Sequence, residues 1–252
     1  TFCLIQRLCN LAGCHPRRIG LSATIGDPEA AGRFLAAGSG RKTVIPAFDG
    51  GREVWRLSME HFFNTVPQAD EGKQDVPETP VPESATDTAP KAADPGTGYI
   101  FEHTRGKKCL IFTNSREECE AVCQNLRQYC EANHEPDRFL IHHGNLSVSY
   151  RESAEEEMKD DDSLLSATAT LELGIDIGRL ERAFQIDAPF TVSGFLQRMG
   201  RTGRRGDPSE MWFVMREDHP EARAMLPDMI PWYLVQGIAL VQLYLEERFV
   251  EP

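Results

Sequence analysis

Four arginines lie close together in one short segment of the chain, QRMGRTGRR at residues 197–205. The forked guanidinium group of arginine makes paired contacts with phosphate oxygens. Arg201 and Arg204 are three residues apart, so at a helix end they would project to the same side and could grip one phosphoryl group. A solvated basic helix end would have the same composition, and this segment alone leaves both interpretations open. Its glycines do not follow a predicted strand, which weakens a dinucleotide-binding interpretation.

A second segment combines hydroxyl groups, glycines and one acid at residues 166–178 (SATATLELGIDIG). It leaves a predicted buried strand and enters a loop at the carboxyl edge of the sheet, where open α/β folds bind ligands. Hydroxyl groups and free backbone amides there suit phosphate oxygens, and the carboxylate of Asp176 suits a ribose hydroxyl. Taken singly, Thr168 or Asp176 would more often be a capping or turn residue.

Two shorter polar segments also follow predicted strands. Ser22-Ala23-Thr24 comes after one strand, and the segment HHGNLS (residues 142–147) comes after another. Ser147 could simply cap the helix that follows, and a His pair beside a strand is usually structural. These two segments indicate a functional site only in combination with residues 166–178 and 197–205.

The elements that must position these groups alternate between short apolar runs and amphipathic helical patterns. This rhythm is typical of βα units around a mostly parallel sheet. The predicted strands are residues 18–22, 55–63, 108–113, 139–142, 164–168, 183–186 and 211–215. The predicted helices are residues 28–37, 115–131, 147–159, 192–201 and 232–249, with helix-start signals at Asp27-Pro28 and at Ser115 with Glu118.

One long segment, residues 67–98, differs from the rest in composition. It contains six prolines, and its seven acids outnumber its two lysines by five. A segment so poor in apolar residues cannot bury enough surface to offset its conformational entropy. We therefore expect a disordered insertion at residues 65–98.

The whole-chain composition restricts the class of protein. The chain has 252 residues, 40% of them hydrophobic and 26% charged, and its net charge of −12 argues against a protein that coats nucleic acid by bulk charge. It has no run of about 18 apolar residues, and its first residues, TFCLIQRLCN, lack the basic and the uninterrupted apolar regions of a signal peptide. Its seven cysteines lack paired zinc-site spacing, so we expect reduced thiols and a cytoplasmic protein, with Cys119 and Cys123 on a buried helix face.

In this order, the segments resemble the motifs of superfamily 2 helicases, the DEAD/DEAH-like ATP-driven motors with two RecA-like domains. Residues 22–24 resemble motif III, residues 109–115 motif IV, residues 167–176 motif V and residues 197–204 motif VI. More closely, the stretches RIGLSATIGDPE, HHGNLS, LELGID, FLQRMGRTGRR and LVQGIALVQLYLEERFVEP are similar to the large helicase-related (Lhr) branch, whose helicase core is followed by a winged helix.

The resemblance implies roles around ATP, the expected cofactor of the parent protein together with Mg²⁺. Arg201 and Arg204 would act as arginine fingers. Asp176, with Gly174 beside it, would contact the nucleotide ribose or a neighbouring catalytic group. Gln197 would help to organise the cleft between the two RecA-like domains.

The resemblance also implies a second surface, which contacts single-stranded or duplex DNA or RNA. Its residues would touch the backbone of one strand, and such contacts read no sequence. They are Thr168, His143, Gly144 and Ser147. Two further residues, Ser22 and Thr24, would couple hydrolysis to domain closure.

The chain departs from the family pattern in the motifs that should bind the nucleotide phosphates and Mg²⁺. A phosphate-cradling G-x-x-x-x-G-K-[S/T] loop should precede motif III, but Gly106-Lys107 lacks both the upstream Gly and the following Ser or Thr. Asp70-Glu71 cannot replace the acidic box that holds Mg²⁺, because it lies after motif III and inside the expected insertion. The chain also does not begin with Met. We therefore expect a piece of a longer protein that cannot hydrolyse ATP by itself.

We predict an α/β chain with a three-layer RecA-like domain at residues 52–218. Residues 1–51 would be the C-terminal end of a preceding RecA-like domain, which would also be the partner of this domain in the parent chain. Residues 219–252 would begin a helical or winged-helix region. Two alternatives remain: a catalytically inactive nucleic-acid-binding or regulatory module, and a phosphoryl transferase, for which no nucleophile is evident. A Walker loop in the upstream sequence would exclude the inactive module.

Overall fold

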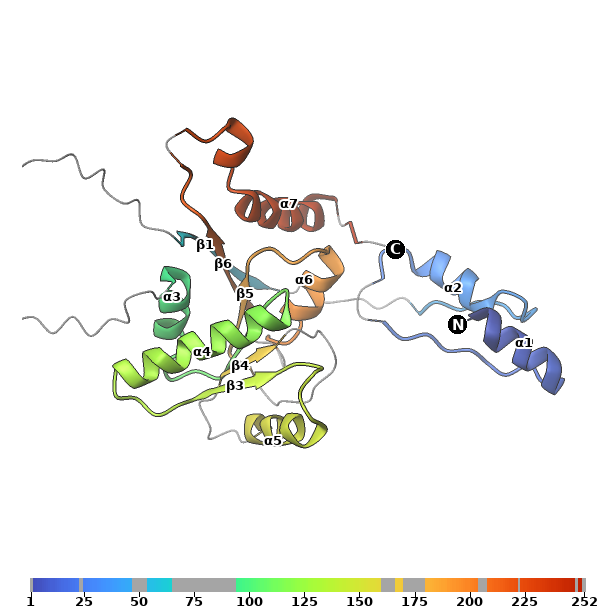
Figure 1. The fold of residues 1–252 in the computed structure, drawn as a ribbon. Coiled ribbons are helices and arrows are strands. Elements are labelled where there is room, and N and C mark those ends of the chain that lie inside the picture. Colours follow the sequence, from blue (N-terminus) through green and yellow to red (C-terminus); the bar gives the residue numbers. More distant parts are fainter. Residues whose placement is uncertain are drawn as a thin grey trace, which may run out of the picture.

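The computed structural model describes residues 2–22, 25–46, 54–64, 94–159, 166–169, 180–203, 208–221, 223–247 and 249–250. Its centre is a six-stranded parallel sheet in the order β1-β6-β5-β2-β4-β3 (Figure 1). The strands are β1 (Trp55–Phe63), β2 (Cys109–Phe112), β3 (Phe139–His142), β4 (Ser166–Ala169), β5 (Arg182–Ile186) and β6 (Ser209–Glu217). The predicted α/β fold with a parallel sheet is confirmed.

Helices cover both faces of the sheet and make the domain three-layered. In chain order they are α1 (Phe2–Ala12), α2 (Pro28–Ala36), α3 (Pro95–His103), α4 (Arg116–Ala132), α5 (Val148–Lys159), α6 (Val192–Met199), the short 3₁₀ helix η2 (Leu226–Met229) and α7 (Trp232–Glu247). Helices α3 and α4 pack on one core, whereas α6 and α7 pack on the other. Figure 1 draws α1 and α2 together and apart from the sheet.

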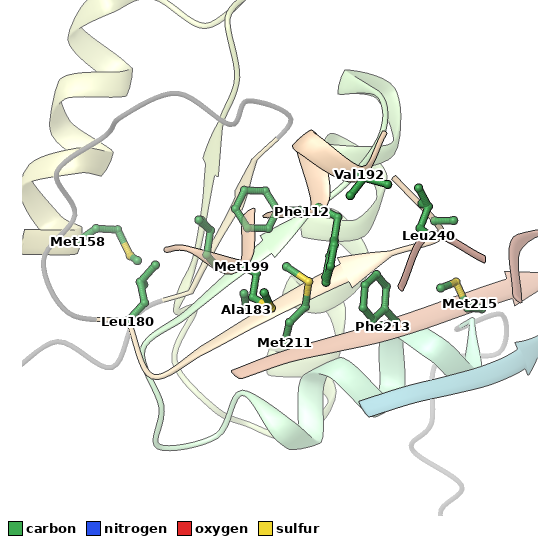
Figure 2. Packing of buried hydrophobic residues seen from close by; sticks show 13 residues of the cluster. Phe112, Met158, Leu180, Ala183, Val192, Met199, Met211, Phe213, Met215 and Leu240 are labelled. Carbon is green, nitrogen blue, oxygen red and sulfur yellow. The ribbon is translucent and has the colours of Figure 1, made fainter. Parts of the chain in front are cut away.

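The two cores follow from the alternation of side chains along each strand. In β2, Leu110 and Phe112 join the core under α6 and α7, while Cys109 and Ile111 join the core under α3 and α4. All four are buried, so the strand reads as a continuous apolar run. Figure 2 shows the first core, in which residues such as Val192 and Phe213 fill the space beside the sheet.

One predicted strand is wrong. Residues 18–22 form no strand, and the side chains of Ile19 and Leu21 are 83% and 95% exposed. A parallel strand needs a neighbour for its backbone hydrogen bonds, and within the described residues none lies beside this segment. The guanidinium of Arg18 instead donates to the carbonyl oxygens of Leu35 and Ala37, at 3.0 and 2.9 Å.

The expected insertion ends earlier than its composition indicated. Residues 65–93 lie outside the described part of the chain, but helix α3 begins at Pro95. Asp94 caps this helix by accepting a hydrogen bond from the Gly96 amide at 2.9 Å. A side chain at Gly96 would collide with Val214, because its Cβ would lie 2.9 Å from Val214 Cγ1. The small residue there permits close packing of the helix on the sheet.

The seven cysteines divide into an exposed and a buried group. All seven are free; Cys3 and Cys14 are exposed, and the other five are buried. Cys119 and Cys123 lie on the buried face of α4, as expected. Burial raises the pKa of the Cys119 thiol to about 12, so this thiol stays protonated at neutral pH.

Candidate functional site

Helix α6 carries the arginine-rich segment to the amino-terminal edge of the sheet. The helix starts at the Thr191 cap, whose hydroxyl accepts from the Gly194 amide at 3.0 Å, and it buries Val192 and Phe195 against the sheet. The chain then turns, and Thr202 forms a parallel bridge with Leu180, two residues before β5 begins. Arg201 therefore lies at the edge of the sheet where the strands start, with a partly exposed side chain.

The predicted nucleic-acid residues lie at the opposite edge, where the strands end. His143, Gly144 and Ser147 follow β3, and Thr168 lies in the neighbouring strand β4, paired with Ile141. The backbone of Thr168 thus lies in the strand next to β3, opposite Ile141, two residues before the turn at residues 143–147 begins. The sheet separates this group from Arg201 by the length of the strands.

The turn at residues 143–147 exposes backbone and a hydroxyl group, but not its histidine. Gly144, Asn145 and Ser147 are exposed, whereas the side chain of His143 is only 2% exposed. Its Nε2 atom lies 2.9 Å from the Glu120 carboxylate, in a geometry that makes no hydrogen bond. The imidazole therefore cannot meet a large ligand at the surface, and a contact at this residue would have to involve its backbone.

Ser147 caps the next helix, which was the alternative role for it. Its hydroxyl accepts a hydrogen bond from the Tyr150 amide at 3.3 Å. The first turn of α5 holds no acidic residue, while the first turn of α4 at the same edge holds Glu117 and Glu118. The amino terminus of α5 is thus the more favourable of the two for an anion.

The same edge carries a charged cluster that the sequence interpretation did not identify. Arg216 on β6 forms ion pairs with Asp94 and Asp187, both at 3.1 Å, and with Glu118. Burial raises the pKa of Asp187 to about 6, even though the neighbouring guanidinium opposes this shift. Asp187 also has a positive φ of 54° just after β5. A charged residue late in an apolar strand was the only sequence signal for this cluster.

Several predicted residues fall outside the described part of the chain. They are Thr24, Gly174, Asp176 and Arg204. Ser22 is described and lies exposed in irregular backbone. Gln197 lies in the last turn of α6 and is partly exposed.

The described residues include no cluster of metal-ligating side chains. They contain no group of three or more His, Cys, Asp or Glu side chains placed to hold a metal ion. The sequence has no Walker loop, and among the described residues the arginine-rich end of α6 is the part that suits the phosphate end of a nucleotide. Among the described helices, none is long and apolar enough to cross a membrane.

Comparisons with known proteins find a helicase domain in this chain. Residues 97–206 match the family described as Helicase conserved C-terminal domain. The chain is 32% identical to the ATP-dependent helicase Lhr-Core of Sulfolobus acidocaldarius over 74% of its length, and 31% identical to that of Methanothermobacter thermautotrophicus over 80%. It spans 19% and 22% of those relatives, about a fifth of their length.

A solved structure extends the similarity to nearly the whole chain. The structure of Mycobacterium smegmatis helicase Lhr bound to ssDNA and AMP-PNP covers 98% of this chain with a TM-score of 0.69 at 25% identity. This chain corresponds to 28% of that protein. A structure of the helicase MrfA bound to DNA and AMPPNP matches the fold with a TM-score of 0.58 at 21% identity.

Proposed function

Because the chain carries the helicase C-terminal domain of a superfamily 2 helicase of the Lhr type, we propose that it is the second RecA-like part of an ATP-dependent nucleic-acid motor. Its task in the parent protein is to supply arginine fingers to a shared ATP site and part of the surface that holds one strand. The observation that carries this proposal is the placement of Arg201 and the turn at residues 143–147 on opposite edges of one parallel sheet.

The first edge serves phosphoryl transfer. Arg201 lies in a turn whose backbone is held on both sides: helix α6 precedes it, and the bridge between Thr202 and Leu180 follows it. When ATP is bound, it supplies the phosphoryl group on which negative charge develops. A fixed guanidinium at this place would neutralise that charge in the transition state. We assign the same role to Arg204, and to Asp176 and Gly174 a contact with the nucleotide.

The second edge serves nucleic acid. The exposed residues Gly144 and Asn145, the Ser147 hydroxyl and the acid-free first turn of α5 form a local anion-binding surface on a chain whose net charge is −12. Such a surface would hold phosphates without reading bases, which suits a motor that moves along any sequence. We propose that Thr168 completes this surface beside the turn.

The N-terminal part supports a partner domain in the parent chain. Helices α1 and α2 expose several large apolar side chains, among them Leu8, Leu11 and Phe34 at 67%, 86% and 62%. Apolar side chains at this density normally lie against another surface. We propose that residues 1–51 complete the first RecA-like domain, that Ser22 and Thr24 couple the two domains there, and that Mg²⁺ is held by the residues of that first domain.

The nucleic-acid surface is tested by adding one negative charge to the turn. Asn145→Asp should weaken binding of a single-stranded oligonucleotide by the full-length parent, because the new carboxylate repels phosphate. Asn133→Asp is the matched control, since Asn133 is an exposed asparagine after α4, at the opposite edge of the sheet.

Binding of both variants is measured by fluorescence anisotropy at several salt concentrations. We expect Asn145→Asp to reduce affinity several-fold at low salt and Asn133→Asp to leave it unchanged. Equal effects of the two variants would contradict the placement of the strand at the turn. A parent without nucleic-acid-stimulated ATP hydrolysis would instead favour an inactive binding module.

A further inference from the structure

Two buried polar side chains flank Arg201 in the sequence and in the structure. Arg198 is 6% exposed and Thr202 is 2% exposed. The resemblance to helicase motifs assigned no role to either of them. Both belong to the segment that carries Arg201, and both connect this segment to other elements of the sheet.

Arg198 points from α6 into the apolar core between the helix and the sheet. Its guanidinium lies over the Phe112 ring, 5.4 Å from the ring centroid. It donates hydrogen bonds to Gln185 Oε1 and, at 3.3 Å, to Asn114 Oδ1. One helical side chain is thereby tied to β5 and to the second residue after β2.

The two acceptors are themselves held in place. Gln185 Nε2 donates to the carbonyl oxygens of Ile186 and Asp187, at 2.7 and 2.9 Å. Asn114 Nδ2 donates to the Ala188 carbonyl oxygen at 2.9 Å. Because the NH₂ group of each side-chain amide donates to these backbone carbonyl oxygens, the oxygen of each amide is the atom that faces Arg198. The arrangement fixes the direction from which the guanidinium must arrive.

Burying the Arg198 guanidinium costs desolvation free energy, and an apolar side chain would pack in the surrounding core without that cost. What the bonded arginine adds is orientation. In an α-helix of 3.6 residues per turn, a slip of one residue rotates every side chain by about 100°. The bonds of Arg198 to two fixed amides exclude such a rotation of α6, and so they fix the direction in which the turn after the helix leaves.

Thr202 holds the other side of the turn. Its hydroxyl accepts from the Glu210 amide at 2.9 Å and donates to the Met199 carbonyl oxygen at 3.1 Å. Its own carbonyl oxygen accepts from the Ser209 hydroxyl at 3.2 Å. The residue after Arg201 is therefore fastened both to the end of α6 and to the start of β6.

We propose that Arg198 and Thr202 are positioning residues that hold the backbone of Arg201 for phosphoryl transfer, without touching the nucleotide. This inference rests on the proposed arginine-finger role of Arg201. Misplacement of a catalytic group by about 1 Å can cost about 10²-fold in rate. Loosening either attachment should therefore lower turnover while leaving ATP binding largely intact.

The test uses the full-length parent and pairs of close variants. Thr202→Val keeps the shape and removes the hydroxyl, whereas Thr202→Ser keeps the hydroxyl. Arg198→Lys keeps the charge, but its ammonium ends about one bond short of the Nη1 atom, which donates to both amides in the arginine. Arg138→Lys is the matched control, because Arg138 is another largely buried arginine, stacked on Phe101 and Phe139 on the other face of the sheet.

The readouts are kcat and KM for ATP with saturating single strand, at a temperature well below the unfolding midpoint of every variant. We expect Thr202→Val and Arg198→Lys to lower kcat about 10- to 100-fold with KM changed less than about threefold, and Thr202→Ser to retain most of the turnover. The Arg138→Lys variant should lose thermal stability and keep its kcat.

The outcomes separate this inference from the proposed function. If Arg201→Ala removes turnover while Thr202→Val and Arg198→Lys keep it, the positioning role is wrong and the arginine finger stands. If Arg201→Ala itself keeps normal turnover, the arginine-finger role of Arg201 is wrong, and the positioning role that rests on it is wrong as well. Equal losses of kcat in Thr202→Ser and Thr202→Val, or in Arg138→Lys and Arg198→Lys, would indicate a purely structural role.

Discussion

The carboxylate of Asp94 lies 3.1 Å from a guanidinium nitrogen of Arg216, although 122 positions separate the two residues in the sequence. Asp94 is also the N-terminal cap of α3. It thus fastens the start of this helix to the end of β6, immediately after the long proline-rich segment. We therefore predict that the boundary between dispensable and structural sequence lies just before Asp94.

The first prediction concerns this boundary. Replacing residues 67–91 with a short Gly/Ser linker should leave the unfolding midpoint nearly unchanged, because the composition of that segment offers no core. Replacing residues 67–98 should destabilise the chain strongly, because the second replacement also removes Asp94 and the first turn of α3. Urea unfolding followed by circular dichroism measures both.

Asp94→Ala isolates the capping residue. It removes one helix cap and one partner of a buried arginine, so we expect a loss of about 1–3 kcal/mol in the free energy of unfolding. Equal stability of the two linker variants would show that α3 does not depend on this anchor.

The second prediction is a pH dependence that arises from Asp187. Its pKa is raised from 3.8 to about 6 in the folded chain, so at pH 5 the folded state holds a proton that the unfolded state has lost. The stability that this group contributes is therefore full below about pH 4 and is lost as the pH rises through about 6.

Asp187→Asn removes this titration and tolerates the positive φ of 54° at that position. The free energy of unfolding of this variant is measured with urea and compared with that of the unsubstituted chain. The difference, variant minus unsubstituted chain, should rise by about 2–3 kcal/mol between pH 4 and pH 7. Asp228→Asn, on the exposed η2, should show no such trend. A flat difference for Asp187→Asn would contradict the raised pKa.

The third prediction concerns thiol reactivity. Under native conditions at pH 8, iodoacetamide should modify Cys3 and Cys14, which are exposed, and leave the five buried cysteines unmodified. Cys119 should be among the slowest, because burial raises its pKa to about 12. Mass spectrometry of tryptic peptides measures the rates, and denaturant should make all seven reactive. Rapid native labelling of Cys119 would contradict its place in the core.

Much of the sheet could be predicted because its strands are short apolar runs between helical patterns. In β2, Leu110 and Phe112 face one core, and Cys109 and Ile111 face the other. All four residues are apolar, and such a run indicates a strand that is buried on both faces. Residues 18–22 (RIGLS) alternate apolar with other residues, as a strand with one buried face does, and yet form no strand, because a local pattern does not show whether a neighbouring strand is present.

Composition does not predict helix α3, because its glycines and proline are also typical of disordered segments. Asp94-Pro95 has the same form as Asp27-Pro28, which correctly indicated the start of α2. The two glycines that follow reflect close packing: a Cβ atom at Gly98 would lie 2.8 Å from the Tyr129 hydroxyl. Tertiary packing of this kind has no local sequence signal.

The candidate site was predictable in its residue types, but not in its arrangement. The spacing of the arginines marked the segment at residues 197–205, yet nothing in it distinguishes the buried Arg198 from the partly exposed Arg201. Their difference arises from Gln185 and Asn114, which lie elsewhere in the sequence. Likewise, His143 was a reasonable candidate until its burial beside Glu120 was evident.

The fourth prediction is that this chain alone folds and does not hydrolyse ATP. Its sequence has no Walker loop, and its described residues offer no metal site. A coupled-enzyme assay should give no turnover above background, with or without single strand. Anisotropy should show weak binding of single-stranded oligonucleotides that falls steeply with salt, because only phosphate contacts are available. Robust turnover would mean that the arginine-rich segment serves a complete ATP site within this chain.

The last prediction concerns the two arginines proposed as fingers, tested in the full-length parent. An arginine finger contributes about 10³–10⁵-fold to turnover in other phosphoryl-transfer systems, because it neutralises charge that develops mainly in the transition state. Arg201→Ala and Arg204→Ala should therefore abolish nucleic-acid-stimulated hydrolysis, while binding of a fluorescent ATP analogue and the unfolding midpoint stay nearly unchanged. Lysine at either position should rescue poorly, since a point charge cannot reproduce the forked contact.

Arg205→Ala is the matched control, because it removes the same charge one residue further along the segment. A general loss of positive charge would affect all three variants alike, whereas directed contacts with one phosphoryl group require the spacing of Arg201 and Arg204. We therefore expect Arg205→Ala to retain most of the turnover. If Arg205→Ala is as damaging as the other two, or if Arg201→Ala and Arg204→Ala keep near-normal turnover, the assignment of these side chains to the transferred phosphoryl group is wrong.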